Sequence, residues 1–185
     1  VGEFTGNKVW DNSAGYEIQI YSEALESDLK VINNFLSGDN SIISIESLHP
    51  STFPAVDITH NTFCLAEKAI VAFEDCTVNI NRNIFTDLLI AIDLHPLTNF
   101  QIEENLFWDN VVNGQTGSIF WEGDPLLVDP SNGDFHLHPG SPAIDKVSGG
   151  SVTTDIDGEP RPIGSAVDLG ADEYGAFIFM PLILR

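Results

Sequence analysis

Residues 56–63 of the chain read VDITHNTF, and this stretch decides the fold prediction. Val56 and Ile58 alternate with polar residues, which is the pattern of a strand that buries one face. Phe63 follows Ile58 by five positions and breaks the alternation, so the three side chains share one interior only if the backbone bends near Asn61. Asn tolerates the left-handed conformation that such a bend needs. The stretch therefore predicts two short strands joined by a sharp turn at Asn61.

The same pattern, apolar-x-apolar-x-x-Asn-x-apolar, recurs along the first two-thirds of the chain, most clearly as VNINRNIF at 78–85 and FQIEENLF at 100–107. A second apolar run separates the copies, so each repeat contains at least two strands. In stacked repeats like residues form columns, and asparagines can hydrogen-bond from one layer to the next. The predicted asparagine ladder, at intervals of 27, 27, 22 and 22 residues, consists of Asn7, Asn34, Asn61, Asn83 and Asn105.

A repeat of this length, with short strands and no helical periodicity, fits one layer of a solenoid. A propeller blade of about 40 residues is longer, and the Leu-rich strand signature of leucine-rich repeats is absent from the sequence. We therefore predict an all-β chain that forms a right-handed parallel β-helix of about five to seven coils with an irregular C-terminal segment. The coils are expected in residues 1–122, a C-terminal coil and cap segment in 123–175, and an apolar tail in 176–185.

The sequence changes character at Gly123, where a series of short motifs begins. In order, they read GDPLLVDP at 123–130, GDFHL at 133–137, PGSPAID at 139–145, DIDGEPRP at 155–162 and DLGADEY at 168–174. This succession resembles the C-terminal portion of secreted bacterial right-handed parallel β-helix repeat proteins of the pectate-lyase-like superfamily. The resemblance implies that fold and export. It leaves the activity open, because members range from polysaccharide lyases and hydrolases to proteins of no known activity.

The chain carries 28 Asp and Glu residues against 7 Lys and Arg, which gives a formal net charge of −21 at pH 7. We expect no nucleic-acid partner, because binding to phosphates needs a basic face. An anionic membrane surface would repel the chain for the same reason. Apolar residues make up 43% of the sequence, which is enough for one packed core. Few cysteines and many Asn, Asp, Ser and Thr residues suit an exported bacterial protein, so we expect an extracellular or cell-surface location.

The residues that precede the asparagines form a predicted outward column of Gly6, Asn33, His60, Arg82 and Glu104. Here Arg82 could pair with the carboxylate of an anionic sugar, His60 could exchange protons, and Glu104 would lie beside them, so these three are the catalytic candidates. The alternative is a surface ladder in which Arg82 only pairs with Glu104, an interaction of little energetic weight. The sequence lacks the paired Asp residues and the Gly-His-Gly and Arg-x-Lys motifs of the related polygalacturonases.

A second group of candidates lies near the end of the second strand of each repeat. These carboxylates are Glu17, Glu46, Glu74 and Asp93. Paired carboxylates hydrolyse glycosides, but in so acidic a chain the alternative is a solvated face. Trp10 and Trp108 are candidates for carbohydrate binding, together with Tyr21 and Trp121, because aromatic rings stack on sugars. A hydrophobic core would use the same residues as readily.

Two groups have metal-ligand chemistry. Asp155, Asp157 and Glu159 alternate along a loop with oxygen ligands that suit Ca²⁺; apart from this candidate we expect no cofactor. The alternative is a turn held by Asx hydrogen bonds, with Arg161 reaching a nearby carboxylate. His136 and His138 lie two apart on a predicted strand and could share a metal, but no third ligand is evident.

Cys64 and Cys76 lie 12 residues apart, within one repeat, so they would not stack in a column. Because a disulfide needs Cβ atoms about 4 Å apart, we expect free, partly buried thiols.

Both ends of the chain suggest partners. The first repeat begins within a few residues of Val1, so we expect another protein chain or an upstream segment to cover it. The tail is strongly apolar but too short to span a membrane, and it is expected either to pack as a strand along the repeats or to dock elsewhere. The docking candidates are Phe177, Ile178, Phe179, Leu182, Ile183 and Leu184.

The expected function is therefore that of a non-catalytic extracellular or cell-surface module with a structural or protein-interaction role, part of a larger chain or assembly. The alternative is a β-helix domain that binds or degrades polysaccharide, as a lyase or hydrolase. A screen for binding or cleavage of polysaccharides at an outward-facing groove of the coils would distinguish the two functions.

Overall fold

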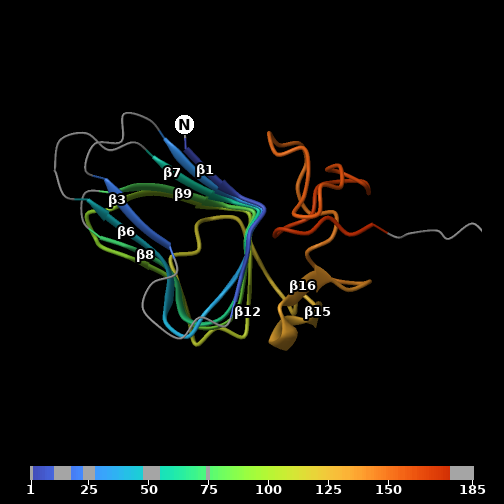
Figure 1. Cartoon of the computed structure of the whole chain (residues 1–185), viewed down its shortest axis with the longest axis horizontal. Coiled ribbons are helices and arrows are strands. Elements are labelled where there is room, and N and C mark those ends of the chain that lie inside the picture. Colours follow the sequence, from blue (N-terminus) through green and yellow to red (C-terminus); the bar gives the residue numbers. More distant parts are fainter. Residues whose placement is uncertain (1, 11–17, 23–27, 48–54, 74–75, 176–185) are drawn as a thin grey trace, which may run out of the picture.

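The structure, a computed structural model, describes residues 2–10, 18–22, 28–47, 55–73 and 76–175. In these residues the chain is all-β with parallel sheets, apart from one short 3₁₀ helix, η1 (Pro130–Asn132). The arrangement is compatible with the expected solenoid. The strands stack on one side of the molecule, and the C-terminal segment lies beside the stack (Figure 1).

The first sheet is built from the opening strands of the five repeats. Its order is β1 (Gly2–Thr5), β4 (Leu29–Ile32), β7 (Val56–Thr59), β9 (Thr77–Asn81) and β11 (Asn99–Glu103). All four pairings are parallel, and Ile58 lies opposite Val31 on one side and Ile80 on the other. The predicted repeats therefore stack in the register that their sequence spacing indicates.

The second sheet contains the strands that follow the asparagines. Its main path is β14 (Phe120–Glu122), β12 (Asn105–Trp108), β10 (Ile84–Leu94), β8 (Thr62–Ala72), β5 (Phe35–Ser37) and β2 (Lys8–Val9), joined by β3 (Ile18–Ser22), β6 (Ser41–Ser47) and β13 (Val112–Gly114). The long strands β8 and β10 bend at Leu65 and Asp87, where φ is 53° and 54°. These bends divide each of the two repeats into three straight faces.

The first bend of each repeat lies one residue earlier than the sequence suggested. The positive φ falls on the residue before each asparagine, with values of 53° to 67°, at Gly6, Asn33, His60, Arg82 and Glu104. The prediction that the asparagine itself takes the left-handed conformation was wrong. With the bend before it, the asparagine side chain lies along the stack and bonds to its neighbours instead.

The five asparagines form one hydrogen-bonded column. The Nδ2 atom of each donates to the Oδ1 atom of the next, at 2.9 to 3.0 Å, and the backbone N–H of the same residue donates to that oxygen as well. Asn34, Asn61, Asn83 and Asn105 are fully buried. The column satisfies polar groups that would otherwise be unpaired in the interior.

Apolar columns fill the space between the sheets. Phe63 stacks on Phe85 with ring centroids 4.9 Å apart, and Phe85 stacks on Phe107 at 5.2 Å. A second column consists of Val31, Ile58, Ile80 and Ile102, all buried. These side chains belong to one core cluster, so the repeats cannot bury their apolar faces separately.

The C-terminal segment does not continue the stack. It contains a small antiparallel sheet of β15 (Leu127–Asp129) and β16 (Asp134–Leu137). Its apolar residues pack on outward-facing side chains of the second sheet, with Leu169 in one cluster with Ile84 and Leu106, and Phe135 in another with Phe35. The segment therefore covers a side of the repeats rather than an end (Figure 1).

A buried ion pair holds this segment together. The Nη1 atom of Arg161 lies 3.0 Å from Oε2 of Glu173, and both side chains are at most 1% exposed. The guanidinium also donates to the carbonyl oxygens of Asp168 and Gly170, and to Oδ1 of Asn33 in the repeats. The expectation that Arg161 reaches a carboxylate is confirmed.

Candidate functional site

The predicted catalytic column does not present His60 to solvent. His60 is only 1% exposed, and its Nδ1 atom has no hydrogen-bond partner among the described residues. Burial holds the pKa of His60 well below 6.5, and the positive charges of Arg161 and Arg82 lower it further, against smaller opposite effects of backbone groups of Asp168 and Gly170. The outward position expected for the His60 side chain was wrong, because the C-terminal segment covers it.

The His60 imidazole makes a testable contribution to stability. Below pH 6.5 the unfolded chain takes up a proton at His60 that the folded protein does not bind, so the folded protein loses stability as the pH falls. We expect urea denaturation at pH 7.5 and 5.5 to show a steeper loss for the wild type than for His60→Gln, by up to about 1.4 kcal/mol per pH unit. Comparison of the two proteins cancels the titration of Asp168 and other groups, and equal pH slopes would contradict the assignment.

Arg82 is engaged on two sides. Its Nε atom lies 2.8 Å from Oε2 of Glu104, and its Nη1 atom donates to the carbonyl oxygen of Gly149 at 2.7 Å. The alternative of a paired surface ladder is confirmed for these two residues. Arg82 thus connects the repeats to the C-terminal segment.

A polar groove of about 470 Å³ lies between the first sheet and residues 150–152. Its floor is a row of outward side chains at equivalent positions on four neighbouring strands: Lys30, Asp57, Asn79 and Gln101. Asn79 donates to Asp57 at 2.6 Å. The groove offers amide, carboxylate and ammonium groups at strand spacing, but Arg82 and Glu104 at its edge are already paired.

Trp10 borders a second hollow, of about 360 Å³, lined also by Ser37, Asp39 and Asn132. Its ring lies against Gly133, where an added Cβ atom would be 3.0 Å from the indole. The Trp10 side chain is 48% exposed. An exposed indole beside hydroxyl, carboxylate and amide groups is suited to stacking on a sugar ring.

The other aromatic candidates lie elsewhere. Trp108 is 43% exposed and lies at the end of β12, opposite Thr86 of β10. Trp121 is half-buried against the cluster that contains Leu169. The side chain of Tyr21 lies outside the described residues.

The loop with the predicted Ca²⁺ ligands forms an Asx turn. Oδ1 of Asp155 accepts hydrogen bonds from the backbone N–H groups of Asp157 and Glu159, and Oδ2 accepts from the N–H of Glu173. Asp155 is buried, with both oxygens in use. Within the described part of the chain, Asp155, Asp157 and Glu159 do not converge as a metal-ligand set, and the turn alternative accounts for them.

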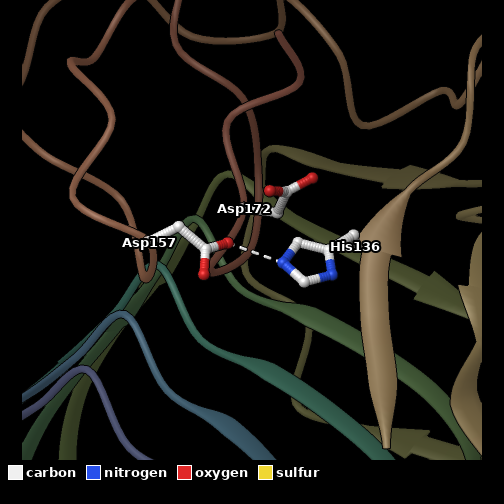
Figure 2. A group of neighbouring side chains, drawn as sticks. All are labelled: His136, Asp157 and Asp172. Carbon is white, nitrogen blue, oxygen red and sulfur yellow. Dashed lines mark hydrogen bonds and ion pairs between the residues drawn. The ribbon is translucent and has the colours of Figure 1, made fainter.

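A different set of ligand atoms converges around His136. One ligand atom each of His136, Asp157 and Asp172 lies within 4.8 Å of the others (Figure 2). Nε2 of His136 is 2.6 Å from Oδ2 of Asp157, and Nδ1 contacts Oδ1 of Asp134. Burial alone would lower the pKa of His136, but the hydrogen bonds with Asp134 and Asp157 outweigh it and raise the pKa.

Sequence reasoning missed Asp134 and Asp172. Asp134 stands two residues before His136 and so lies on the same strand face, which is a usable signal. No comparable sequence signal links Asp172 to His136, because Asp172 lies in another motif, 36 residues further along the chain. His138, the partner expected for His136, is exposed beyond the end of β16 and does not join the cluster.

The remaining candidates do not form a site among the residues that the structure describes. Asp93 pairs with Lys68 at 2.7 Å and Glu46 is half-buried on β6, whereas Glu17 and Glu74 lie outside the described residues. Cys64 and Cys76 are buried and form no disulfide with each other, as expected. The tail candidates between Phe177 and Leu184 also lie outside the described residues.

Comparison with known proteins adds no relative. No protein-family model, curated protein or solved structure matches the chain. Among the described residues, no helix has the length and apolar character to cross a membrane.

Proposed function

We propose that the chain is a right-handed parallel β-helix module of an extracellular or cell-surface protein, and that its role is non-catalytic, structural or in protein interaction. The parallel ladders, the asparagine column and the stacked phenylalanines support the helical winding. Such a stack forms a rigid rod, because each layer is bonded to both neighbours. The resemblance of its C-terminal motifs to those of exported β-helix proteins supports the location.

The non-catalytic role is carried by the state of the residues that precede the asparagines, called here the corner column: Gly6, Asn33, His60, Arg82 and Glu104. His60 is buried beneath the C-terminal segment, and Arg82 is held by Glu104 and by the Gly149 carbonyl. A general base must reach a substrate proton at hydrogen-bond distance. The residues with the most suitable chemistry therefore attach the C-terminal segment instead.

The second candidate function is carbohydrate binding, and the Trp10 hollow is the observation that favours it. The indole face, Asp39, Ser37 and Asn132 surround a space large enough for one or two sugar rings. Binding of this kind needs no acid–base pair. It would give the module an adhesive role.

One glycan screen tests both functions. We expect no cleavage of polyuronate or neutral glycans, with or without Ca²⁺. For any glycan that the wild type binds, the affinity should fall at least about tenfold in Trp10→Ala. Trp108→Ala is the matched control and should bind like the wild type. Cleavage that disappears in His60→Ala or Arg82→Ala would overturn the non-catalytic role, and equal binding by both Trp variants would remove the Trp10 subsite.

A further inference from the structure

We propose that His136, Asp157 and Asp172 form a binding site for one divalent transition-metal ion, with Zn²⁺ as the best match to the donor set. The three side chains come from three separate segments: β16, the loop at 155–159 and the segment at 168–174 (Figure 2). One imidazole nitrogen and two carboxylate oxygens make a three-ligand site with an open position. The nitrogen ligand favours this class of ion over Ca²⁺, which takes oxygen ligands.

The distances allow the site to close on an ion. Donors at 2.0–2.2 Å from a tetrahedral metal stand roughly 3.3–3.5 Å apart. The three ligand atoms lie within 4.8 Å of one another, and Nε2 of His136 and Oδ2 of Asp157 are 2.6 Å apart. Side-chain movements of about 1 Å therefore convert the present hydrogen-bonded cluster into a coordination sphere. The Asp157 side chain is 44% exposed, so the packing around it does not prevent these movements.

Each ligand is already held by a neighbouring group. Asp134 contacts Nδ1 of His136, which leaves Nε2 directed into the cluster. The backbone N–H of Leu137 donates to Oδ2 of Asp172 at 2.8 Å, and Lys8 lies 3.7 Å from Oδ1 of Asp157. A carboxylate on the far nitrogen of the histidine and hydrogen bonds to the ligating carboxylates are usual around protein metal sites.

Asp172 gives an independent indication. Asp172 is only 6% exposed, and its Oδ2 atom accepts a hydrogen bond from the backbone N–H of Leu137. A carboxylate charge that is buried to this extent is costly unless hydrogen bonds and a cation compensate it. Figure 2 shows this carboxylate beside the His136 ring.

The experiment is a Zn²⁺ titration, measured by calorimetry, of the full chain after treatment with a chelator and desalting. We expect one equivalent of Zn²⁺ to bind, Co²⁺ to give the visible bands of a four- or five-coordinate ion, and the melting temperature to rise with Zn²⁺. Asp157→Asn should weaken binding at least about tenfold. Because Asp157 is exposed, this variant keeps the fold, which far-UV circular dichroism checks. His138→Gln, an exposed neighbour of His136, is the matched control.

Two results would overturn the site. The first is that the wild type binds no stoichiometric Zn²⁺. The second is that wild type, Asp157→Asn and His138→Gln bind with the same affinity, which would assign the ion to the acidic surface as a whole. The outcome does not depend on whether the module binds glycans.

Discussion

Replacement of Arg161 by alanine is expected to lower the free energy of unfolding by about 3–5 kcal/mol, because it leaves the Glu173 carboxylate buried without its countercharge. Both side chains are at most 1% exposed. The change also removes hydrogen bonds to the carbonyl oxygens of Asp168 and Gly170 and to Asn33. The effect should appear in urea denaturation at pH 7 as a fall in midpoint.

Arg82→Ala is the matched control for this loss. Its ion pair with Glu104 is partly exposed, at 19% and 32% for the two side chains. Exposed pairs contribute little, so we expect a loss of about 1 kcal/mol or less. If Arg161→Ala were no more destabilising than Arg82→Ala, the C-terminal segment would not depend on the buried pair.

Asn83→Ala is expected to destabilise the repeats by about 2–4 kcal/mol. The Asn83 side chain accepts hydrogen bonds from the backbone and Nδ2 of Asn61, and it donates to Asn105 and to the carbonyl oxygen of Ile58. Alanine removes the acceptor of a buried backbone N–H at Asn61. Urea denaturation followed by tryptophan fluorescence measures the loss.

Asn81→Ala provides the comparison within the same repeat. Asn81 is half-buried at the groove surface, two residues before Asn83. Substitutions at such positions change stability by about 0.5 kcal/mol or less. Similar losses in the two variants would show that the asparagine column contributes no more than any other asparagine.

The repeats could be predicted from the sequence because the signal is local and periodic. The intervals of 27 and 22 residues equal the offsets of the strand partners, such as Leu29 with Val56 and Val56 with Val78. Each window contains its own strand alternation and its own asparagine. Stacking then follows, since one repeat alone cannot bury its apolar face.

The fate of the corner column could not be predicted, because it depends on contacts between distant segments. His60 occupies the same position in its repeat as the other members of the column, directly before the asparagine. Residues 168–170 nevertheless pack against it and remove it from solvent. The bond from Arg161 to Asn33 spans 128 residues. No periodic pattern reports such a contact.

The metal-ligand cluster shows the same limit. Asp155, Asp157 and Glu159 are neighbours in sequence, but Asp155 turns its oxygens to its own loop and to Glu173. Asp157 instead meets His136 and Asp172, which two other motifs provide. The ligand residue types were visible in the sequence, whereas their grouping required the packing of the C-terminal segment.

The stacked register of the asparagine windows is tested most directly by NMR on a sample labelled with ¹⁵N at asparagine. The account predicts NOEs between Asn61 and Asn83, and between Asn83 and Asn105, with side-chain amide protons that exchange slowly because they are buried and hydrogen-bonded. Side-chain amides that exchange at solvent rates and show NOEs only to neighbours in sequence would contradict it.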